Sequence, residues 1–557
     1  MKNIPYNDIV KISSIKEIME LAAKEAGDKA AYKIPDKNSY KSVTFREFND
    51  TVDFIGTALK SRGLTTGHIA IVGKNSYEWL TAYLTVLKSA GVVVPIDKEL
   101  PFTDISNILI NSDSEVLFYA DEFEKDLLTA EFPKIKYFIG FDREEDDGRF
   151  LSYKKLIADG KALFENGNKS FLSETRDENL LKMLVYTSGT TGMAKGVMLS
   201  EHNLVSCIYN GLLIASVKGT GFSVLPYNHT YAAVVEILVS IHLHNTICIN
   251  DSIRKIPKNM LLFKPDYMYI VPAYAEVFYK KIIATAKKQG KYKALMAMIK
   301  ISNALLKIGI DVRRKLFKSV LDGLGGNIYK FVCGGAPVRS EIGDFFESIG
   351  VIFMNGYGIT ECSPLVSGNR EGDSEPESVG VPIPCVEIKF DEVDSDGIGE
   401  ICVKGDTVML GYYKQPGLTK EVLSDDGWFK TGDFGKFNER GHLMITGRKK
   451  NLIVLKNGKN IYPEEIEEYI LAIPYVSETV VTAVKDEDGN DASLCAHVFL
   501  NSDAVEQLGI TNPAETVKKD ISAATAHLPS YKHITSVVVR DTEFPKTTTR
   551  KIKRNLI

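Results

Sequence analysis

The chain has 557 residues, of which 44% are hydrophobic and 25% are charged. This length exceeds the roughly 250–300 residues at which a single core stops growing, so we expect several domains, and the composition excludes wholesale disorder. With 68 basic and 72 acidic residues the net charge is −4, which excludes a protein that coats nucleic acid or grips a membrane through its overall charge.

Several features predict a soluble cytoplasmic protein. No uninterrupted apolar run reaches the roughly 18 residues that a membrane-spanning helix needs, and the N-terminal segment has no signal-peptide core. The seven cysteines are an odd number, too sparse for a disulfide framework, and none forms a CxxC pair. The nine histidines show no HxxxH spacing, so the sequence predicts no zinc site.

The first part of the chain has the pattern of an α/β protein. Thr44–Glu47 has the capping-box pattern, and apolar residues at helical spacing follow it, which predicts a helix that ends near Gly63. A strand at 69–72, a helix at 79–87 and a strand at 92–94 come next, an order that indicates a parallel sheet. Further short β-rich runs, typical of buried strands, lie at 116–119, 246–249, 267–271, 329–333 and 351–354.

Beyond about residue 380 the pattern changes to polar–apolar alternation with Gly-rich turns, which predicts an antiparallel β-subdomain. Its strands are expected at 387–390, 399–404 and 443–445. A final block of about a hundred residues has the pattern of a small α+β domain. Its strands are expected at 479–484, 496–500 and 536–539. We therefore predict an α/β fold with a large N-terminal domain (1–447) of layered sheets plus the β-subdomain, and a small mobile C-terminal α+β domain (448–557).

The segment Phe278–Lys318 is strongly basic, with twelve Lys or Arg and a single acid, Asp311. Apolar residues lie among the charges, so a basic amphipathic helix pair is expected here. Such a pair could make a weak peripheral contact with an anionic membrane leaflet. The commoner origin of the pattern is a solvated helical face, and we favour that interpretation.

The strongest chemical signal is the segment Tyr186–Gly196, which is dense in Gly, Ser and Thr and contains Lys195. Apolar strands at 183–185 and 197–199 flank it. Bare backbone amides, hydroxyls and an ammonium are the components of a phosphate-binding loop. The segment is not a Walker A loop, because Lys195 is followed by Gly196 rather than by Ser or Thr.

At this segment the sequence resembles the adenylate-forming (AMP-binding) superfamily, and most closely its bacterial long-chain fatty acyl-CoA synthetases. The resemblance extends over most of the chain through motifs in the family's order. These motifs are Leu225–His229, Cys333–Pro337, Asn355–Glu361, Gly411–Tyr413, Gly427–Asp433, Gly447–Lys450 and Pro545–Lys551.

The resemblance implies roles for many residues in binding ATP and Mg²⁺. Thr187 and Glu361 are the expected metal ligands, and Mg²⁺ prefers one or two protein oxygens plus substrate phosphates. Tyr357 is expected to stack on adenine, Asp433 to accept hydrogen bonds from the ribose hydroxyls, and Arg448 to contact ribose or phosphate. The remaining residues expected to bind nucleotide are Ser188, Gly189, Thr190, Thr191, Gly192, Lys195, Gly335, Ala336, Pro337, Asn355, Gly356, Gly358 and Thr360.

Without the resemblance, each of four of these residues could also have a purely structural role. Glu361 could cap the segment that follows it, and Tyr357 could be an ordinary core residue. Asp433 suits turn chemistry, and Arg448 begins what is more often a solvated charge run.

Lys551 carries the most specific prediction. The family's C-terminal lysine approaches the substrate carboxylate and the α-phosphate and stabilises charge during adenylation. Arg550 stands where the family has Gly, which puts the flexibility of this loop in doubt. Without the resemblance, Lys551 would be assigned to a solvated basic tail.

Three further positions follow from the resemblance. Lys450 falls where the family has its hinge between domains. Gly458, Lys459 and Asn460 are expected to line the channel for the thiol of coenzyme A. His229 is expected between the acyl pocket and that channel, although a lone histidine is more often a structural hydrogen bonder.

The predicted function is ATP-dependent ligation of a carboxylic acid, a medium- or long-chain fatty acid, to coenzyme A through an acyl-adenylate. Splitting the reaction is chemically sensible because a carboxylate is a poor acyl donor and a mixed anhydride has a good leaving group. One alternative is transfer to the phosphopantetheine of a carrier protein, which would be separate because no carrier domain follows Ile557. Another is a nucleotide-binding homologue without turnover. A nucleic-acid partner is not expected.

Overall fold

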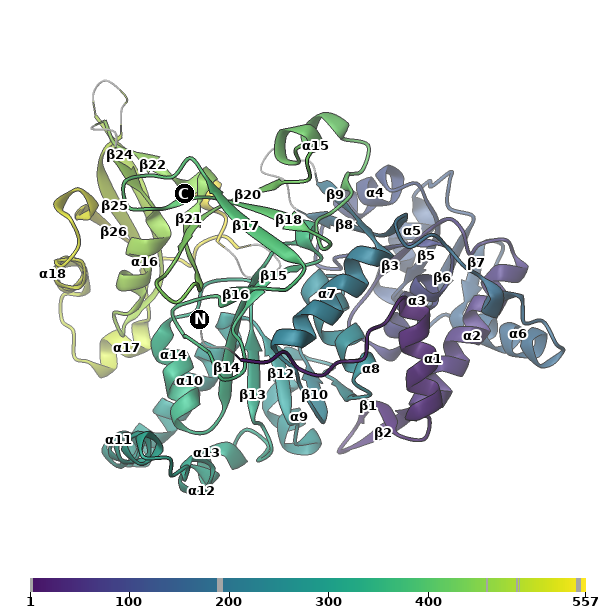
Figure 1. Ribbon diagram of the computed structural model, residues 1–557, viewed down its shortest axis with the longest axis horizontal. Coiled ribbons are helices and arrows are strands. Elements are labelled where there is room, and N and C mark those ends of the chain that lie inside the picture. The colour runs from purple at the N-terminus through teal and green to yellow at the C-terminus, as the bar shows by residue number, and fades with distance from the viewer. Residues whose placement is uncertain (1–3, 188–193, 457–458, 487–488, 490, 547–551) are drawn as a thin grey trace. The chain divides into compact units, whose positions relative to one another are not determined.

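The computed structural model describes residues 4–187, 194–456, 459–486, 489, 491–546 and 552–557. These residues form two compact units, drawn together in Figure 1. The first unit comprises 1–387 and 403–429, and the second comprises 388–402 and 430–557.

A nine-stranded sheet forms one layer of the first unit, in the order β16-β15-β14-β13-β12-β10-β11-β1-β2. The six strands from β14 to β1 pair in parallel, and β15, β16 and β2 add antiparallel edges. The strands are β1 (Ala30–Asp36), β2 (Ser39–Thr44), β10 (Thr220–Ser223), β11 (Thr246–Ile249), β12 (Tyr267–Ile270), β13 (Lys330–Cys333), β14 (Ile352–Gly358), β15 (Leu365–Gly368) and β16 (Val381–Pro382).

An eight-stranded sheet forms a second layer, in the order β19-β9-β8-β4-β3-β5-β6-β7. Its strands from β8 to β7 pair in parallel, whereas β9 pairs antiparallel with both β8 and β19. The strands are β3 (His68–Val72), β4 (Val92–Ile96), β5 (Ser114–Tyr119), β6 (Tyr137–Gly140), β7 (Phe150–Ser152), β8 (Leu181–Thr187), β9 (Lys195–Ser200) and β19 (Gly411–Tyr412).

Helices follow most strands of the first unit (Figure 1). They are α1 (Ile15–Glu25), α2 (Phe45–Ser61), α3 (Tyr77–Lys88), α4 (Phe102–Asn111), α5 (Glu124–Thr129), α6 (Tyr153–Glu165), α7 (Glu201–Ile214), α8 (Val239–His242), α9 (Ile256–Phe263), α10 (Pro272–Lys288), α11 (Tyr292–Lys307), α12 (Arg313–Leu316), α13 (Lys318–Asp322), α14 (Ser340–Ser348) and α15 (Pro416–Val422).

Local chemistry explains why α2 begins and ends where it does. The Thr44 hydroxyl accepts a hydrogen bond from the Glu47 amide at 3.2 Å, and the Glu47 carboxylate accepts one from the Thr44 amide at 2.8 Å. This reciprocal pair is the predicted capping box, and it satisfies amides that the first helical turn leaves unbonded. Gly63 adopts φ +68° just beyond the end of the helix, a conformation that favours glycine.

The second unit contains most of the sheet β17-β18-β20-β21 and all of the sheet β24-β25-β26. Its strands are β17 (Val386–Asp391), β18 (Gly399–Gly405), β20 (Phe429–Phe437), β21 (Leu443–Arg448), β22 (Ile453–Val454), β23 (Asn460–Ile461), β24 (Val476–Lys485), β25 (Asp491–Leu500) and β26 (Ile534–Arg540). Its helices are α16 (Pro463–Leu471), α17 (Ser502–Gln507) and α18 (Pro513–Ala524). A core that includes Ile466, Val481, Ala496 and Val517 joins α16 and α18 to the three-stranded sheet.

The predicted fold class is confirmed. The strand–helix–strand unit is β3, α3 and β4, and the short apolar runs are strands of the two parallel sheets. The pair β20–β21 is antiparallel, as expected for the β-subdomain. Among the described residues, no helix is both long enough and apolar enough to span a bilayer.

One buried acid stands out in the first unit. Residues Tyr231–Leu238 form a π-helix, η3, and its Glu236 is only 3% exposed. The Oε2 atom of Glu236 has no hydrogen-bond partner among the described residues. Burial raises the pKa of this carboxyl to about 8, and nearby Ser223 lowers the pKa only in part. Glu236 therefore carries its proton at neutral pH, because an ionised carboxylate in this environment is costly.

The raised pKa predicts how stability depends on pH. In the unfolded chain this carboxyl ionises near pH 4.5. Its protonated form therefore stabilises the fold fully below pH 4.5, and this stabilisation decreases as the pH rises to about 8. The loss amounts to at most about 1.4 kcal/mol per pH unit. We expect Glu236→Gln to raise the melting temperature, and to do so more at pH 8 than at pH 5. Melting curves at both pH values test this, with the exposed Glu145→Gln as control. A gain independent of pH would contradict it.

Candidate functional site

Three segments that carry predicted site residues lie at one edge of the nine-stranded sheet. Because β10, β12, β13 and β14 are parallel, their carboxyl ends lie along the same edge. The segment with His229 follows β10, Gly335–Pro337 follow β13, and β14 ends in Tyr357 and Gly358 just before Glu361. This edge is where ligands bind in open α/β sheets.

Contacts between these segments are close. A Cβ atom on Gly334 would lie 3.4 Å from the Tyr231 ring and 3.6 Å from the carbonyl oxygen of Gly356. The Tyr231 hydroxyl donates a hydrogen bond to the carbonyl oxygen of Val332 at 2.8 Å. A Cβ atom on Gly358 would lie 1.9 Å from the carbonyl oxygen of Pro364, so only glycine fits there.

The sequence-predicted residues of this edge differ in exposure. Gly335, Ala336 and Pro337 are exposed, and Gly335 has φ +86°. Tyr357 is 9% exposed in β14, with Gly356 and Gly358 half-buried on either side. Asn355 is buried and donates its side-chain amide to the carbonyl oxygen of Pro376 at 2.8 Å. This hydrogen bond gives Asn355 a structural role, because it fixes the segment of Pro376 against β14.

The predicted phosphate-binding segment is flanked by the antiparallel pair β8–β9. Thr187 ends β8 and pairs with Lys195, which begins β9. Both residues are half-buried. The predicted residues Ser188, Gly189, Thr190, Thr191 and Gly192 lie outside the described residues.

A hydrogen bond joins the two sheets at this point. The Tyr412 hydroxyl, in β19, donates to Glu361 Oε1 at 2.9 Å, and the Met409 amide donates to the Glu361 carbonyl at 2.9 Å. Glu361 lies in η5 (Thr360–Cys362), directly after β14. The ammonium of Lys195 lies 5.2 Å from the centre of the Tyr412 ring. Tyr412 thus links Glu361 to Lys195, which flanks the predicted phosphate-binding segment.

Burial raises the pKa of Tyr412 well above its ordinary value, and the charge of Glu361 adds to the shift. The phenol therefore stays protonated and serves as a donor to the carboxylate. One oxygen of Glu361 is held in this way, which fixes the orientation of the carboxyl group.

The donors available here fit Mg²⁺. The Glu361 carboxylate and the Thr187 hydroxyl offer oxygen only, which is the donor type that Mg²⁺ prefers. Among the residues described, no group of three His, Cys, Asp or Glu is arranged to hold a metal ion. A Mg²⁺ ion at Glu361 would therefore take its other ligands from water and from substrate phosphates.

Two predicted ribose ligands lie next to each other in the second unit. Asp433 of β20 and Arg448 of β21 are register partners, and Arg448 Nε lies 3.0 Å from Asp433 Oδ1. Asp433 is 3% exposed, and its amide donates to the Thr431 hydroxyl at 3.0 Å. This ion pair orients the Asp433 carboxylate.

The remaining predicted positions of the second unit are only partly described. Lys450 lies in η6 (Lys449–Asn451), and burial and then the nearby Arg448 lower its pKa. The Lys459 ammonium lies 5.7 Å from the centre of the Tyr531 ring, and Asn460 begins β23. Gly458 and Lys551 lie outside the described residues, as does Arg550.

His229 is half-buried in a turn. Its amide donates to the carbonyl oxygen of Pro226 at 3.2 Å, and its carbonyl oxygen accepts from the Ala233 amide at 2.8 Å. These bonds connect the turn to η3, and they hold the histidine at the carboxyl edge of β10.

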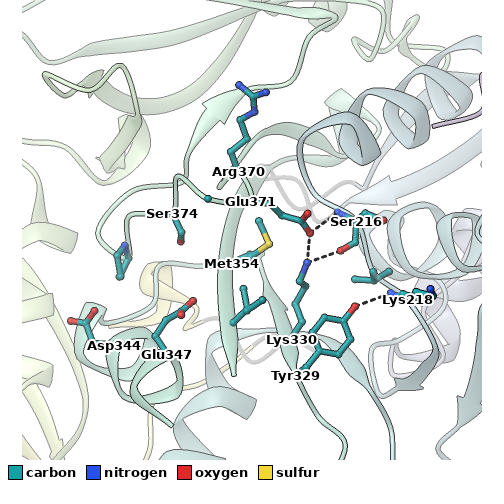
Figure 2. A pocket seen from close by; sticks show the side chains of 14 residues that line it. Ser216, Lys218, Tyr329, Lys330, Asp344, Glu347, Met354, Arg370, Glu371 and Ser374 are labelled. Atoms are coloured by element: carbon teal, nitrogen blue, oxygen red, sulfur yellow. Dashed lines mark hydrogen bonds and ion pairs between the residues drawn. The ribbon is translucent and has the colours of Figure 1, made fainter. Parts of the chain in front are cut away.

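A pocket of about 750 Å³ lies elsewhere in the first unit (Figure 2). Its lining includes Lys330 and Ile352, the first residues of β13 and β14, so it lies toward the amino ends of these strands. Figure 2 shows the Lys330 ammonium bonded to Glu371 and to the carbonyl oxygen of Ser216. None of the predicted site residues lines this pocket.

Tyr412 is the residue that sequence reasoning missed. The motif Gly411–Tyr413 is part of the resemblance, but nothing in the linear pattern indicates that this tyrosine contacts a residue 51 positions away. The available signal was a pair of aromatic residues directly after a glycine. The structure adds that Gly411 has φ +135°, and that β19 pairs with β9.

The chain matches known proteins over most of its length. The model of the family "AMP-binding enzyme" matches residues 19–413, and that of "AMP-binding enzyme C-terminal domain" matches residues 465–551. The chain is 30% identical over 483 residues to long-chain-fatty-acid–CoA ligase 1 of Cavia porcellus, covering 80% of this chain and 68% of that protein. It is 28% identical over 473 residues to long-chain-fatty-acid–CoA ligase FadD15 of Mycobacterium bovis, covering 79% of this chain and 75% of that protein.

Solved structures share the fold. An anthranilate CoA ligase in complex with anthranoyl-AMP superposes with a TM-score of 0.77 at 20% identity, covering 99% of this chain and 97% of that chain. The adenylation domain of a carboxylate reductase from Mycobacterium chelonae gives a TM-score of 0.81 at 21% identity, covering 98% of this chain and 89% of that chain. The resemblance predicted from the motifs is confirmed, and the chain belongs to the family of AMP-binding enzymes, which makes it an adenylate-forming enzyme.

Proposed function

We propose that the protein is a fatty acid–CoA ligase that forms AMP and acts on medium- or long-chain acids. In the first step an oxygen of the acid's carboxylate attacks the α-phosphorus of ATP, and pyrophosphate leaves, which gives the acyl-adenylate. In the second step the thiol of coenzyme A attacks the acyl carbon and loses its proton, and AMP leaves, which gives the acyl-CoA thioester.

The contacts that link Glu361 through Tyr412 to Lys195, the strand partner of Thr187, are the observation that carries this proposal. The first step brings two anions together, so it needs cations and hydrogen-bond donors around the phosphates. The Lys195 ammonium lies beside the Tyr412 ring, and Tyr412 holds the Glu361 carboxylate. In the proposal, Glu361 and Thr187 would hold a Mg²⁺ ion, which would supply positive charge to the phosphates. Lys195 and the segment 188–192 supply further charge and donors.

In the proposal, the residues of the second unit act on the rest of the nucleotide and on the second substrate. Asp433 accepts hydrogen bonds from the ribose hydroxyls, with its carboxylate held by Arg448 at 3.0 Å. Lys551 acts in adenylation, whereas Gly458, Lys459 and Asn460 act in thiol binding. Because the two steps use different second substrates, a domain that changes position between them is expected, with its hinge at Lys450 and the division 1–447 and 448–557.

Support for a fatty acid as substrate comes from the relatives. The curated proteins similar to this chain at 28–30% identity include ligases named for long-chain fatty acids. These identities support the acid–CoA ligase reaction, and we infer the chain length of the acid from the substrates for which these relatives are named.

The experiment is a pyrophosphate-release assay on a series of acids from acetate to palmitate and on aryl acids, each with and without coenzyme A. We expect release with medium- or long-chain acids, and acyl-CoA and AMP as products only when coenzyme A is present. Turnover of aryl acids alone would refute the fatty-acid assignment and leave adenylation intact. A purified carrier protein that replaces coenzyme A as the better acceptor would refute the assigned thiol.

A further inference from the structure

The helix α11 has two apolar faces. One face is buried, and its Leu295 and Ile299 pack into a core that also contains Phe278 and Phe331. The other face is exposed, and its residues follow one another at spacings of three and four. They are Ala294, Ala297, Ile301, Ala304 and, at the end of the helix, Ile308. At 100° per residue these positions form a stripe on the side opposite to the buried face.

This exposed apolar stripe is large for a single solvated helix. Ile301 is 58% exposed and Ile308 is 71% exposed. Ile310 and Leu316, in the segment that follows, are 48% and 37% exposed. A solvated helical face normally carries polar residues at such positions, so the exposed isoleucines argue against the solvated face that the sequence pattern favoured.

A row of lysines runs beside the stripe. Lys293, Lys300 and Lys307 recur every seven residues, and so occupy one side of the helix next to the stripe. All three are exposed, and none makes an ion pair with any residue that the structure describes. The only acid in the segment 278–318 is Asp311, and Arg313 already binds it, at 2.7 and 3.0 Å. The lysine row therefore places three positive charges beside the stripe that no ion pair among the described residues neutralises.

We propose that this face of α11, the stripe with its lysine row, docks on the surface of an anionic phospholipid bilayer. An interfacial helix needs an apolar face that enters the boundary of the acyl chains and cations at the level of the phosphates, and α11 offers both side by side. In Figure 1, α11 and α12 lie next to each other. A second copy of the chain is a poorer occupant, because the two lysine rows would repel each other. This surface does not depend on the proposed reaction.

The test is co-sedimentation of the full chain with vesicles. Vesicles of phosphatidylglycerol and phosphatidylcholine are compared with vesicles of phosphatidylcholine alone, at low and at high salt. We expect binding to the anionic vesicles only, weakened by salt. The variant K293Q/K300Q/K307Q is expected to lower the partition coefficient about fivefold per lysine, and so about 100-fold. Ile301→Ser with Ile308→Ser is expected to weaken binding while the charge is unchanged.

A matched control keeps the result interpretable. K24Q/K125Q/K420Q removes the same charge from exposed lysines elsewhere in the first unit, and we expect it to bind as the wild type does. Pyrophosphate exchange with a water-soluble acid should be unchanged in all variants, which shows that they fold. Equal binding to neutral vesicles, or equal loss in the control, would overturn the proposal. So would self-association without lipid that Ile301→Ser with Ile308→Ser abolishes, because the face would then join two copies.

Discussion

Glu361→Gln is expected to slow the acid-dependent exchange of pyrophosphate into ATP by about 10²–10³-fold. The substitution keeps the size of the side chain and removes its charge, so the proposed Mg²⁺ ligand is lost while the Tyr412 hydroxyl can still donate to the amide oxygen. The measurement is the exchange rate at saturating ATP over a range of Mg²⁺ concentrations.

Two tyrosine variants sharpen this test. Tyr412→Phe leaves the Glu361 carboxylate in place but removes the hydrogen bond that orients it. We therefore expect the apparent affinity for Mg²⁺ to fall about 10–100-fold, and the exchange rate to recover at high Mg²⁺. Tyr413→Phe is the matched control, because the hydroxyl of Tyr413 donates to Asp113 at 2.7 Å instead. If Glu361→Gln exchanged pyrophosphate at the wild-type rate, the metal role of Glu361 would be wrong.

Lys551→Ala is expected to lower adenylation by about 10²–10³-fold, and to change thioester formation from supplied acyl-adenylate far less. The physical reason is that negative charge accumulates between the acid and the α-phosphate only in the first step. Two assays separate the steps: pyrophosphate exchange for adenylation, and release of AMP from acyl-adenylate with coenzyme A for thioester formation.

Lys553→Ala is the control for charge in the same segment. Lys553 is exposed, and its backbone amide bonds to the carbonyl oxygen of Pro545 at 2.8 Å, a contact that alanine keeps. We expect it to leave both half-reactions unchanged. Equal loss of both half-reactions in Lys551→Ala would contradict the assigned role and would indicate a structural effect instead.

Much of the fold could be predicted because its signals are local. The capping box at Thr44, the alternation of strands and helices, and the antiparallel pattern after residue 380 each depend on residues within a few positions. The order of strands could not be predicted in this way. β9 pairs with β19, which lies more than two hundred residues further along the chain, and this pairing depends on the path of the whole intervening chain.

The same distinction between local signals and long-range contacts applies to the candidate site. Thr187, Lys195, Glu361, Asp433 and Arg448 were recognisable because their motifs stand in the family's order. The hydrogen bond between Tyr412 and Glu361 was not, because its partners share no segment of the chain. The raised pKa of Glu236 was likewise invisible, since the shift depends on burial.

The sequence by itself determined the family and the α/β fold, because short motifs and local patterns carry both, and it predicted which residues bind phosphate, metal and ribose. Only the tertiary structure decided which oxygen of Glu361 is held, and which of the two apolar faces of α11 meets the core. Helical spacing assigns residues to faces, but the neighbour that buries a face comes from elsewhere in the chain, here from β13 and α10.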